Sequence, residues 1–366
     1  MDSKDTKKKD RTNQRKPFSL GEPIDREIFE LVEHVAKETG VNFEEFKTTK
    51  ETWLRELFTA VLKLIPDNAD TGDLKIFTKA AREIRYAFKI FAKYRGTPKV
   101  TMFGSARTPP DAPAANAARE FARRIVKEGY MVITGAASGI MYAGNEGAGR
   151  AHSFGLNVRL LFEQEPNVIV TEDPKLITFN YFFTRKLFFM KEASAVVLLP
   201  GGYGTMDEGF EALTLLQTGK NPMIPVILLD EPGGNYWKLW WDFVNQGMLK
   251  HRMISMGDQD LFLITDSIDE AVKEVLTFYK NYHSMRYVGE NLIIRLKKHI
   301  DKTLLKRLNM EFTDIVDGGI ETCGAQPKEQ NNLELPRLKF RFNKSSFCRL
   351  RHLINVINGL PSYRAS

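Results

Sequence analysis

The sequence predicts an α/β protein centred on a doubly wound parallel sheet, with a helical region before the sheet and a small α+β module after it. Three observations support this prediction. Short apolar runs alternate with helical patterns over residues 98–283, and several of these runs end in glycine. The chain has 366 residues, about twice the commonest length of a single domain. Strands, glycine turns and helices in regular succession are typical of Rossmann-like sheets.

Composition and charge divide the chain into four expected segments. These are a disordered tail (1–22), a helical N-terminal region (23–97), a Rossmann-like core (98–283) and a basic α+β module (284–366). Of the net charge of +7, residues 1–16 carry +4 and residues 284–366 carry +7, which leaves −4 for residues 17–283. Nucleic-acid-binding proteins usually concentrate positive charge on their main folded surface, so nucleic acid is not an expected partner.

The basic character of the C-terminal module has two interpretations. Five basic residues lie close together in sequence, namely Arg337, Lys339, Arg341, Arg349 and Arg351. They belong either to a basic packing domain or to a binding site for an anionic nucleotide effector.

Helical periodicity predicts three helices before the core, at Ile24–Thr39, Phe43–Ile65 and Asp73–Tyr94. Gly40, Pro66 and Gly96 follow them, as is typical of residues that end helices. The third helix has an apolar stripe at helical spacing, made of Phe77, Ala80, Ile84, Phe88 and Phe91. We expect this stripe to be core or to pack against the next domain.

The core is predicted as strands that alternate with helices. The expected strands are Lys99–Phe103, Tyr130–Thr134, Asn157–Phe162, Val168–Val170, Ala195–Leu199, Ile224–Leu229 and Leu261–Ile264. The expected helices are Ala112–Glu128, Ile140–His152, Asn180–Ala193, Met206–Thr218, one that begins at Tyr236 and one that ends at Tyr279. In the C-terminal module we expect strands at Arg286–Leu296, Phe312–Ile320 and Leu338–Phe342, helices at Lys302–Met310 and Ser346–Ile357, and a polar loop at Cys323–Glu334.

Composition also excludes several classes of protein. The apolar runs are too short to span a membrane, and the polar N-terminal residues do not resemble a secretory signal. Two distant cysteines, Cys323 and Cys348, and six dispersed histidines indicate neither a disulfide framework nor a metal site. We therefore expect a cytoplasmic protein that has no cofactor and no membrane partner.

Three predicted strands end in turns that contain glycine, at Gly104–Ser105, Gly135–Gly139 and Pro200–Thr205. Ligands of open parallel sheets bind beyond the carboxyl ends of the strands. The third turn lies between a buried strand and a helix, so its N–H groups point at one spot and its glycines let a phosphate approach closely. A tight turn with a purely structural role is the alternative. The turn lacks the Gly-Lys-Ser/Thr of a Walker loop, and the first turn, FGSART, lacks the nicotinamide fingerprint.

Ionisable side chains flank the third turn. Glu208 falls in the first turn of the next helix, where the helix dipole favours its ionised form, and Glu211 and Thr214 follow at spacings of three. Arg185 and Lys186 lie on the preceding helix. If that helix passes over the carboxyl end of the sheet, Arg185 and Glu208 bracket a small anionic ligand. Taken singly, the basic pair is equally well explained as an exposed helix face and Glu208 as a helix-capping charge.

The segment Thr184-Arg185-Lys186 and the segment Pro200–Glu208 (PGGYGTMDE), at this spacing, resemble the RK…PGGxGTxxE signature of the Lonely Guy (LOG) family. Members of this family are phosphoribohydrolases that are often mislabelled as lysine decarboxylases. The resemblance covers about residues 98–283, where FGSAR and TGAASGIMYAGNEGA stand in place of the other glycine turns of the family. The flanking regions are similar to those of its longer bacterial members.

The resemblance implies hydrolysis of the N-glycosidic bond of a nucleoside 5′-monophosphate, without a metal, to free base and ribose 5-phosphate. AMP-like purine nucleotides are the expected substrates, for nucleotide salvage or homeostasis in preference to cytokinin activation, and a homodimer or larger homo-oligomer is expected. Arg185 and Glu208 would be the catalytic pair. Substrate or phosphate would be bound by Lys186, Gly201, Gly202, Tyr203, Gly204, Thr205, Thr214, Gly104, Ser105 and Gly135. Further pocket candidates are Met141, Glu211 and Glu163, the last as the choice for a family carboxylate without a clear counterpart.

Nothing in the sequence determines the base. Phe182, Phe183 or Met141 could stack on it, although the aromatic cluster Tyr181–Phe183 is expected to lie in the core. Two other functions fit the same fold. One is a nucleotide or molybdenum-cofactor carrier that binds without turnover, which the presence of both Arg185 and Glu208 argues against. The other is a single-strand DNA-binding protein, suggested by the basic ends and disfavoured by the acidic balance of residues 17–283.

Overall fold

The computed structural model describes residues 19–160, 165–327, 329 and 331–360, apart from the side chains of residues 45, 48 and 49. The chain divides into two compact units at Ala81/Arg82, which lies inside helix α4 (Thr71–Phe91). The four-segment division stays a prediction, and residues 1–18 of the expected tail lie outside the described residues. In the described part of the chain, no helix combines the length and the apolar character that a membrane span requires.

The first unit is helical and contains α1 (Glu22–Glu38), α2 (Phe43–Thr49), α3 (Glu51–Lys63) and the beginning of α4. Ile28, Val32 and Ala36 form the buried face of α1. The prediction of one helix over Phe43–Ile65 is wrong, because the chain leaves helical geometry at Lys50, with φ −128° and ψ −22°. Two successive threonines, which are poor helix formers, precede this break.

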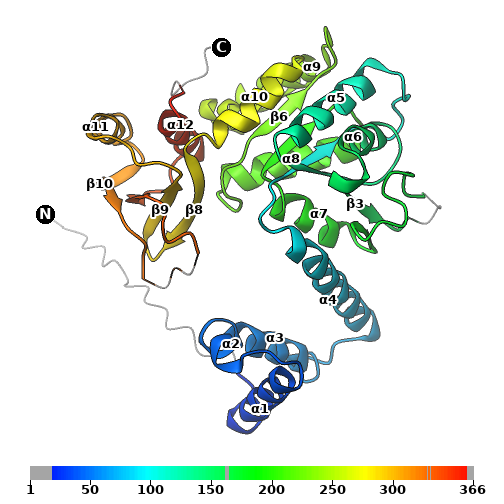
Figure 1. Ribbon diagram of the computed structural model, residues 1–366, viewed down its shortest axis with the longest axis vertical. Coiled ribbons are helices and arrows are strands. Elements are labelled where there is room, and N and C mark those ends of the chain that lie inside the picture. The colour runs from blue at the N-terminus through cyan, green and yellow to red at the C-terminus, as the bar shows by residue number, and fades with distance from the viewer. Residues whose placement is uncertain (1–18, 161–164, 328, 330, 361–366) are drawn as a thin grey trace, which may run out of the picture. The chain divides into compact units, whose positions relative to one another are not determined.

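The second unit is built on a seven-stranded parallel sheet with the strand order β4-β3-β2-β1-β5-β6-β7. Figure 1 labels two of its strands, β3 and β6, and the helices around them. The strands are β1 (Lys99–Phe103), β2 (Met131–Thr134), β3 (Ser153–Val158), β4 (Leu176–Phe179), β5 (Ala195–Leu198), β6 (Val226–Leu229) and β7 (Leu263–Thr265). The chain runs outward from β1 to β4, returns to β5 beside β1, and then runs outward in the opposite direction. The predicted doubly wound α/β fold is therefore confirmed.

Helices cover both faces of this sheet. On one face, α5 (Pro113–Lys127), α6 (Ile140–Ala148) and α10 (Ile268–Phe278) share a core with the central strands. On the other face, the core contains α7 (Phe182–Lys191), α8 (Tyr203–Gln217), α9 (Tyr236–Phe243) and the end of α4. Short helical segments complete the unit, namely η1 (Ala92–Tyr94), η2 (Arg150–His152), η3 (Val244–Leu249) and η4 (Met256–Leu261). Burial on both faces explains why the central strands are continuous apolar runs.

A second, antiparallel sheet follows, with the order β10-β11-β9-β8. It contains β8 (Tyr282–Val288), β9 (Asn291–Leu296), β10 (Val316–Cys323) and β11 (Arg337–Phe342), and it is accompanied by α11 (Lys302–Glu311) and α12 (Phe347–Ile357). The predicted α+β character of this region is confirmed. Buried side chains such as Leu292 and Phe340 belong to the same apolar cluster as α7 and α8, and α12 packs on α8 and η4. The module thus shares its core with the parallel sheet.

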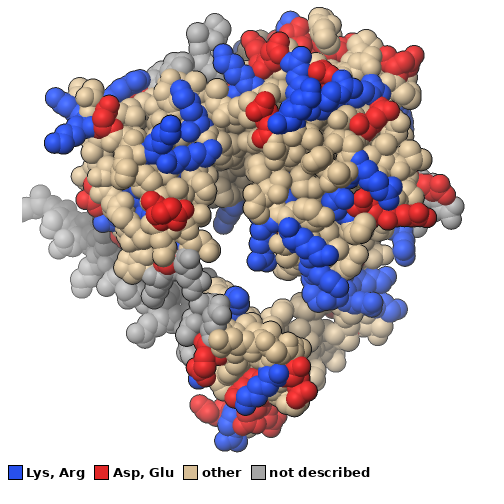
Figure 2. Space-filling model, in the orientation of Figure 1, with Lys and Arg blue, Asp and Glu red and all other residues tan. Residues whose placement is uncertain are grey.

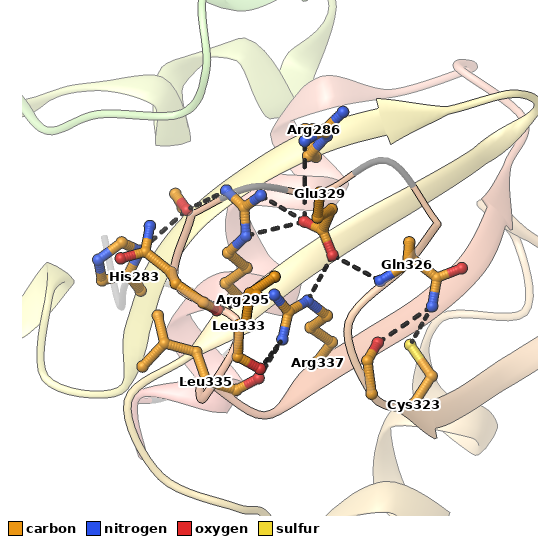
Figure 3. Close-up of polar contacts among 12 residues, drawn as sticks. His283, Arg286, Arg295, Cys323, Gln326, Glu329, Leu333, Leu335 and Arg337 are labelled. Carbon is orange, nitrogen blue, oxygen red and sulfur yellow. Dashed lines mark hydrogen bonds and ion pairs between the residues drawn. The ribbon is translucent and has the colours of Figure 1, made fainter. Parts of the chain in front are cut away.

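One buried carboxylate connects the loop between β10 and β11 to three strands of this sheet (Figure 3). Glu329 accepts a hydrogen bond from Arg337 Nε at 2.9 Å, pairs with Arg295, and lies 3.8 Å from Arg286. The Gln326 backbone amide donates at 2.7 Å to the same Glu329 oxygen as Arg337, and Arg295 and Arg286 lie at the other oxygen. Because a buried charge without a partner is strongly destabilising, Glu329 and Arg337 depend on each other for burial.

The five basic residues that suggested an effector site are all paired with carboxylates. Arg337 pairs with Glu329, and the other pairs are Lys339–Glu321, Arg341–Glu290, Arg349–Asp314 and Arg351–Glu274. In the view of Figure 2, Asp and Glu side chains lie among the Lys and Arg side chains of this module. These ion pairs match the first interpretation, a basic packing domain, and binding of an anionic effector stays a prediction.

Two of the predicted strands in the core are misplaced. Val168–Val170 is a turn, with Val168 74% exposed, and the edge strand of the sheet is β4 at Leu176–Phe179. The strand predicted at Asn157–Phe162 is β3, which begins at Ser153, and residues 161 and 162 lie outside the described residues. Gly155 interrupts the apolar pattern of β3, because a Cβ atom there would lie 2.9 Å from Ala136 Cβ.

Two further predictions need correction. Arg286–Leu296 is a hairpin, in which Gly289, with φ +59°, and Glu290 form the turn between β8 and β9. The strand predicted at Phe312–Ile320 is β10, which begins only at Val316.

The buried face of α4 also differs from the predicted stripe. Phe77 and Phe88 of that stripe are exposed, and Glu83 and Ala87 are buried instead. Because the buried face of α4 contains a glutamate, the hydrophobic pattern of the sequence does not indicate which side of the helix is buried.

Candidate active site

A cavity of about 790 Å³ lies at the carboxyl ends of β1, β2 and β5, where the sheet changes its direction of winding. The turn after β1 contributes Gly104 and Ser105, and the turn after β2 contributes Gly135. Residues 201–205 follow β5 and line the same cavity. The structure therefore brings the three glycine-containing turns of the sequence together around one space.

Backbone hydrogen bonds hold these turns against one another. The Ser105 amide donates to the Pro200 carbonyl at 3.1 Å, and the Ile140 amide donates to the Ser105 carbonyl at 3.0 Å. Close packing explains two of the glycines, because a Cβ atom would lie 2.5 Å from Ile140 Cγ2 at Gly104 and 2.1 Å from Thr205 Oγ1 at Gly201. A Cβ atom at Gly202 or Gly204 would meet nothing within 4 Å. These two glycines leave open space beside the backbone.

Helix α8 begins at Tyr203, not at Met206 as predicted, with Gly202 as its N-cap. Tyr203, Gly204 and Thr205 therefore form its first turn, whose N–H groups have no partner within the helix. The positive end of the helix dipole lies at the same place. Together with the open space beside Gly202 and Gly204, this makes the start of α8 suitable for a phosphate group.

Glu208 lies in the next turn of α8, lines the cavity and is only 5% exposed. Burial raises the pKa of its carboxyl to about 7, against the opposing effect of Lys186 and Arg185. Lys186 Nζ is 3.6 Å from the Glu208 carboxylate. A carboxyl with a pKa near neutrality can exchange a proton during a reaction at physiological pH.

Lys186 does not line the cavity, although it contacts Glu208, which does. Its Nζ is 2.8 Å from Asp207 and 2.9 Å from Glu211. Burial by itself would lower the pKa of Lys186, but the hydrogen bonds to Asp207 and Glu211 raise it. Lys186 thus contacts three carboxylates of α8, those of Asp207, Glu208 and Glu211. Glu211 is a partner of Lys186 and does not line the cavity. Thr214 is exposed further along α8, also outside the cavity.

Arg185 enters the cavity from α7, so this helix does pass over the carboxyl end of the sheet. Its guanidinium carbon lies 4.9 Å from the Phe182 ring centre and 5.3 Å from that of Phe189. Nε is buried without a hydrogen-bond partner among the described residues. Burial lowers the pKa of Arg185, while Glu208 and Asp207 oppose this shift. A guanidinium whose buried Nε donor is unused favours an anionic ligand.

The remaining pocket candidates differ in their placement. Met141 of α6 lines the cavity. Glu163 lies outside the described residues. Phe182 is 51% and Phe183 is 55% exposed, so the expectation that this cluster lies in the core is wrong, and Phe182 lines the cavity. No group of three or more His, Cys, Asp or Glu among the described residues is arranged to hold a metal ion.

Sequence reasoning missed several residues that line the cavity. Arg107 follows the first glycine turn and is the last residue of the FGSAR segment. Asn157 lies on β3, whose position was mispredicted. Tyr236 of α9 donates a hydrogen bond from its hydroxyl to the Gly201 carbonyl. No motif indicates Tyr236, because it reaches the turn from a helix that follows a different strand.

The glycines of the third turn allow a matched test of phosphate binding. We expect Gly202→Ala to leave the melting temperature nearly unchanged and to raise the dissociation constant of a phosphate-containing ligand about tenfold, because the methyl group occupies the open space beside the first-turn amides. Gly201→Ala should instead destabilise the fold by about 1–3 kcal/mol through overpacking. Thermal unfolding of both variants and their calorimetric titration with inorganic phosphate check this. Equal effects of the two substitutions on the dissociation constant and on the melting temperature would contradict it.

Comparison with known proteins adds one sequence family and several structures. Residues 134–275 match a family model described as "possible lysine decarboxylase", and this match supports the resemblance to the LOG family. No curated protein gives a significant match.

Among solved structures, the chain is similar to a molybdenum cofactor binding protein from Rippkaea orientalis, at 19% identity and TM-score 0.36, over 48% of this chain and 94% of that chain. It is similar to the molybdenum cofactor carrier protein of Chlamydomonas reinhardtii, at 21% identity and TM-score 0.34, over 49% and 98% of the two chains. It is also similar to DNA processing protein A from Helicobacter pylori, at 16% identity and TM-score 0.35, over 50% and 83%.

Proposed function

We propose that the protein hydrolyses the N-glycosidic bond of nucleoside 5′-monophosphates, with AMP-like purine nucleotides preferred, to free base and ribose 5-phosphate. One observation carries the proposal. A buried carboxyl with a raised pKa, Glu208, and a partly buried arginine, Arg185, whose Nε has no hydrogen-bond partner among the described residues, line the same cavity as a helix N-terminus that suits phosphate. The physiological role would be nucleotide salvage or homeostasis in the cytoplasm.

The proposed binding mode follows from charge. The phosphate lies against the amides of residues 202–205, where both the helix dipole and the open space beside Gly202 and Gly204 favour it. Binding there is remote from the reacting bond, so its free energy orients the sugar carbon toward Glu208. Phe182, whose exposed ring lines the cavity, is available to stack on the base.

The proposed reaction breaks the bond between C1′ and the base nitrogen, and the bonding electron pair leaves with the base. The transition state resembles an oxocarbenium ion, as in other glycoside cleavage. The Glu208 carboxylate stabilises this positive charge, orients a water molecule toward C1′ and accepts its proton as the new C–O bond forms. Arg185 stabilises negative charge on the phosphate or on the departing base, which takes up a proton as it leaves.

Incubation of the purified protein with AMP, GMP, IMP, CMP and UMP, followed by chromatography of the free bases, tests the proposal. We expect base release from the purine nucleotides, and much slower release from adenosine, which lacks the phosphate. A Glu208→Ala variant serves as the control. Tight binding of the nucleotides without base release would contradict the proposal and would favour the carrier function.

A further inference from the structure

Glu83 is a buried carboxylate outside the cavity, on the part of α4 that belongs to the second unit. One of its oxygens accepts hydrogen bonds from both the backbone amide of Asn180, at 2.9 Å, and the side-chain amide of that residue. The other oxygen accepts from Thr184 Oγ1 at 2.7 Å. These donors all lie at the beginning of α7, about a hundred residues further along the chain.

The beginning of α7 has no cap from its own N-cap residue. Tyr181 at the N-cap makes no side-chain capping hydrogen bond, and the first turn contains no acidic residue. Glu83 supplies the negative charge that stabilises a helix N-terminus. Further along, the rings of Phe91 and Phe88 on α4 pack against Phe188 on α7, with centroids 5.8 Å and 5.5 Å apart. Helix α4 therefore supports α7 along its length, and Glu83 is the polar part of this support.

The residue next to Thr184 is Arg185. Its Nε has no hydrogen-bond partner among the residues that the structure describes, and its guanidinium lies against the Phe182 and Phe189 rings. Its position in the cavity is therefore set by the backbone of the first turn of α7. Glu83 accepts hydrogen bonds on both sides of the N-cap residue Tyr181, from Asn180 just before the helix and from Thr184 in its first turn.

We propose that Glu83 is a positioning residue, which acts through α7 to hold the Arg185 guanidinium in place for the reaction. This inference rests on the proposed function for its kinetic consequences. It extends the site beyond the segment that matches the family model, because Glu83 precedes residue 134. The part of α4 that belongs to the second unit then helps to position a catalytic group.

A spectroscopic experiment tests this inference without reference to activity. In the full chain labelled with ¹⁵N-arginine, the Nε–Hε resonance of Arg185 is identified by its loss in Arg185→Met. We expect Glu83→Ala to shift or broaden this resonance, and Glu83→Gln to restore it largely, because the glutamine oxygen still accepts from Asn180. Arg82→Ala, an exposed neighbour on α4, should leave it unchanged. An unchanged Arg185 resonance in folded Glu83→Ala protein would overturn the inference.

The kinetic experiment is a double-mutant cycle. Glu83→Ala should lower kcat about 10²-fold with a smaller effect on KM, the loss expected from displacement of a catalytic group by about 1 Å. In an Arg185→Met background, Glu83→Ala should cause no further loss, whereas additive losses would show that Glu83 does not act through Arg185. If Glu83→Ala does not fold, Thr184→Val provides the same test with a smaller expected effect. If the native protein releases no base, the proposed function fails, and the resonance of Arg185 still decides the role of Glu83.

Discussion

Glu208→Gln is expected to abolish most base release and at the same time to stabilise the protein above neutral pH. The loss of activity should be about 10²–10⁴-fold in kcat, because the amide can neither accept a proton from water nor stabilise an oxocarbenium ion as a carboxylate does. In the native protein, kcat/KM should fall as the pH decreases below about 7, where the Glu208 carboxylate takes up a proton.

The gain in stability follows from the raised pKa of Glu208. The pKa is 4.5 ordinarily and about 7 in the folded protein, so the folded state favours the neutral form. The associated stability is fully present below pH 4.5 and is lost as the pH rises to 7, by about 3 kcal/mol in total. Glutamine is neutral at every pH and avoids this loss. Denaturant unfolding at pH 4.5 and pH 8 should therefore show equal stability at the lower pH and a more stable variant at the higher pH. A less stable variant at pH 8 would contradict the raised pKa.

Arg185→Met should also lower the activity of the protein and raise its stability. The native guanidinium is packed between aromatic rings, with Nε buried and unpaired, and an unsatisfied buried polar group costs about 1–3 kcal/mol. Methionine has a similar length and no polar atoms, so we expect a higher melting temperature in the absence of ligand. We expect kcat/KM for AMP to fall about 10²–10³-fold, as is typical when a group that stabilises transition-state charge is removed.

Arg85→Met is the matched control for this variant, because Arg85 is exposed on α4. The control should change neither kcat/KM nor the melting temperature appreciably. Differential scanning calorimetry without AMP measures the gain in melting temperature. Scans with AMP measure the loss of AMP binding, since AMP should stabilise the native protein much more than Arg185→Met. Equal stabilisation of the two proteins by AMP would rule out a role of Arg185 in binding the anion.

The parallel sheet could be predicted because its central strands are buried on both faces. Lys99–Phe103 is predicted with the bounds that the structure has, and Ala195–Leu199 differs by one residue. Prediction failed where tertiary structure overrides the local pattern. β3 tolerates Gly155 because the neighbouring chain packs closely against it, and α4 buries Glu83 because Asn180, just before α7, and Thr184 of α7 supply three donors. Neither feature leaves a hydrophobic signal in the sequence.

The candidate site, like the fold, could be predicted from the sequence only in part. The glycine turns and the spacing of Arg185 and Glu208 point to one cavity, because successive parallel strands end at the same edge of the sheet. Pattern reasoning could not tell that Lys186 binds Asp207 and Glu211 behind the cavity wall, since its neighbour Arg185 faces the cavity from the same turn. Tyr236 and Glu83 reach the site or its supports from distant segments, and only three-dimensional contacts show their positions.

The central claim is that water cleaves the N-glycosidic bond in the cavity that Arg185 and Glu208 line. The most direct test is a time course with AMP in ¹⁸O-labelled water, in which adenine and ribose 5-phosphate are quantified together. We predict equal amounts of the two products, with one ¹⁸O atom incorporated at C1 of the sugar, and almost no products with Glu208→Gln protein that still binds AMP. Binding of AMP by the native protein without adenine release, or equal adenine release by the Glu208→Gln variant, would contradict the account.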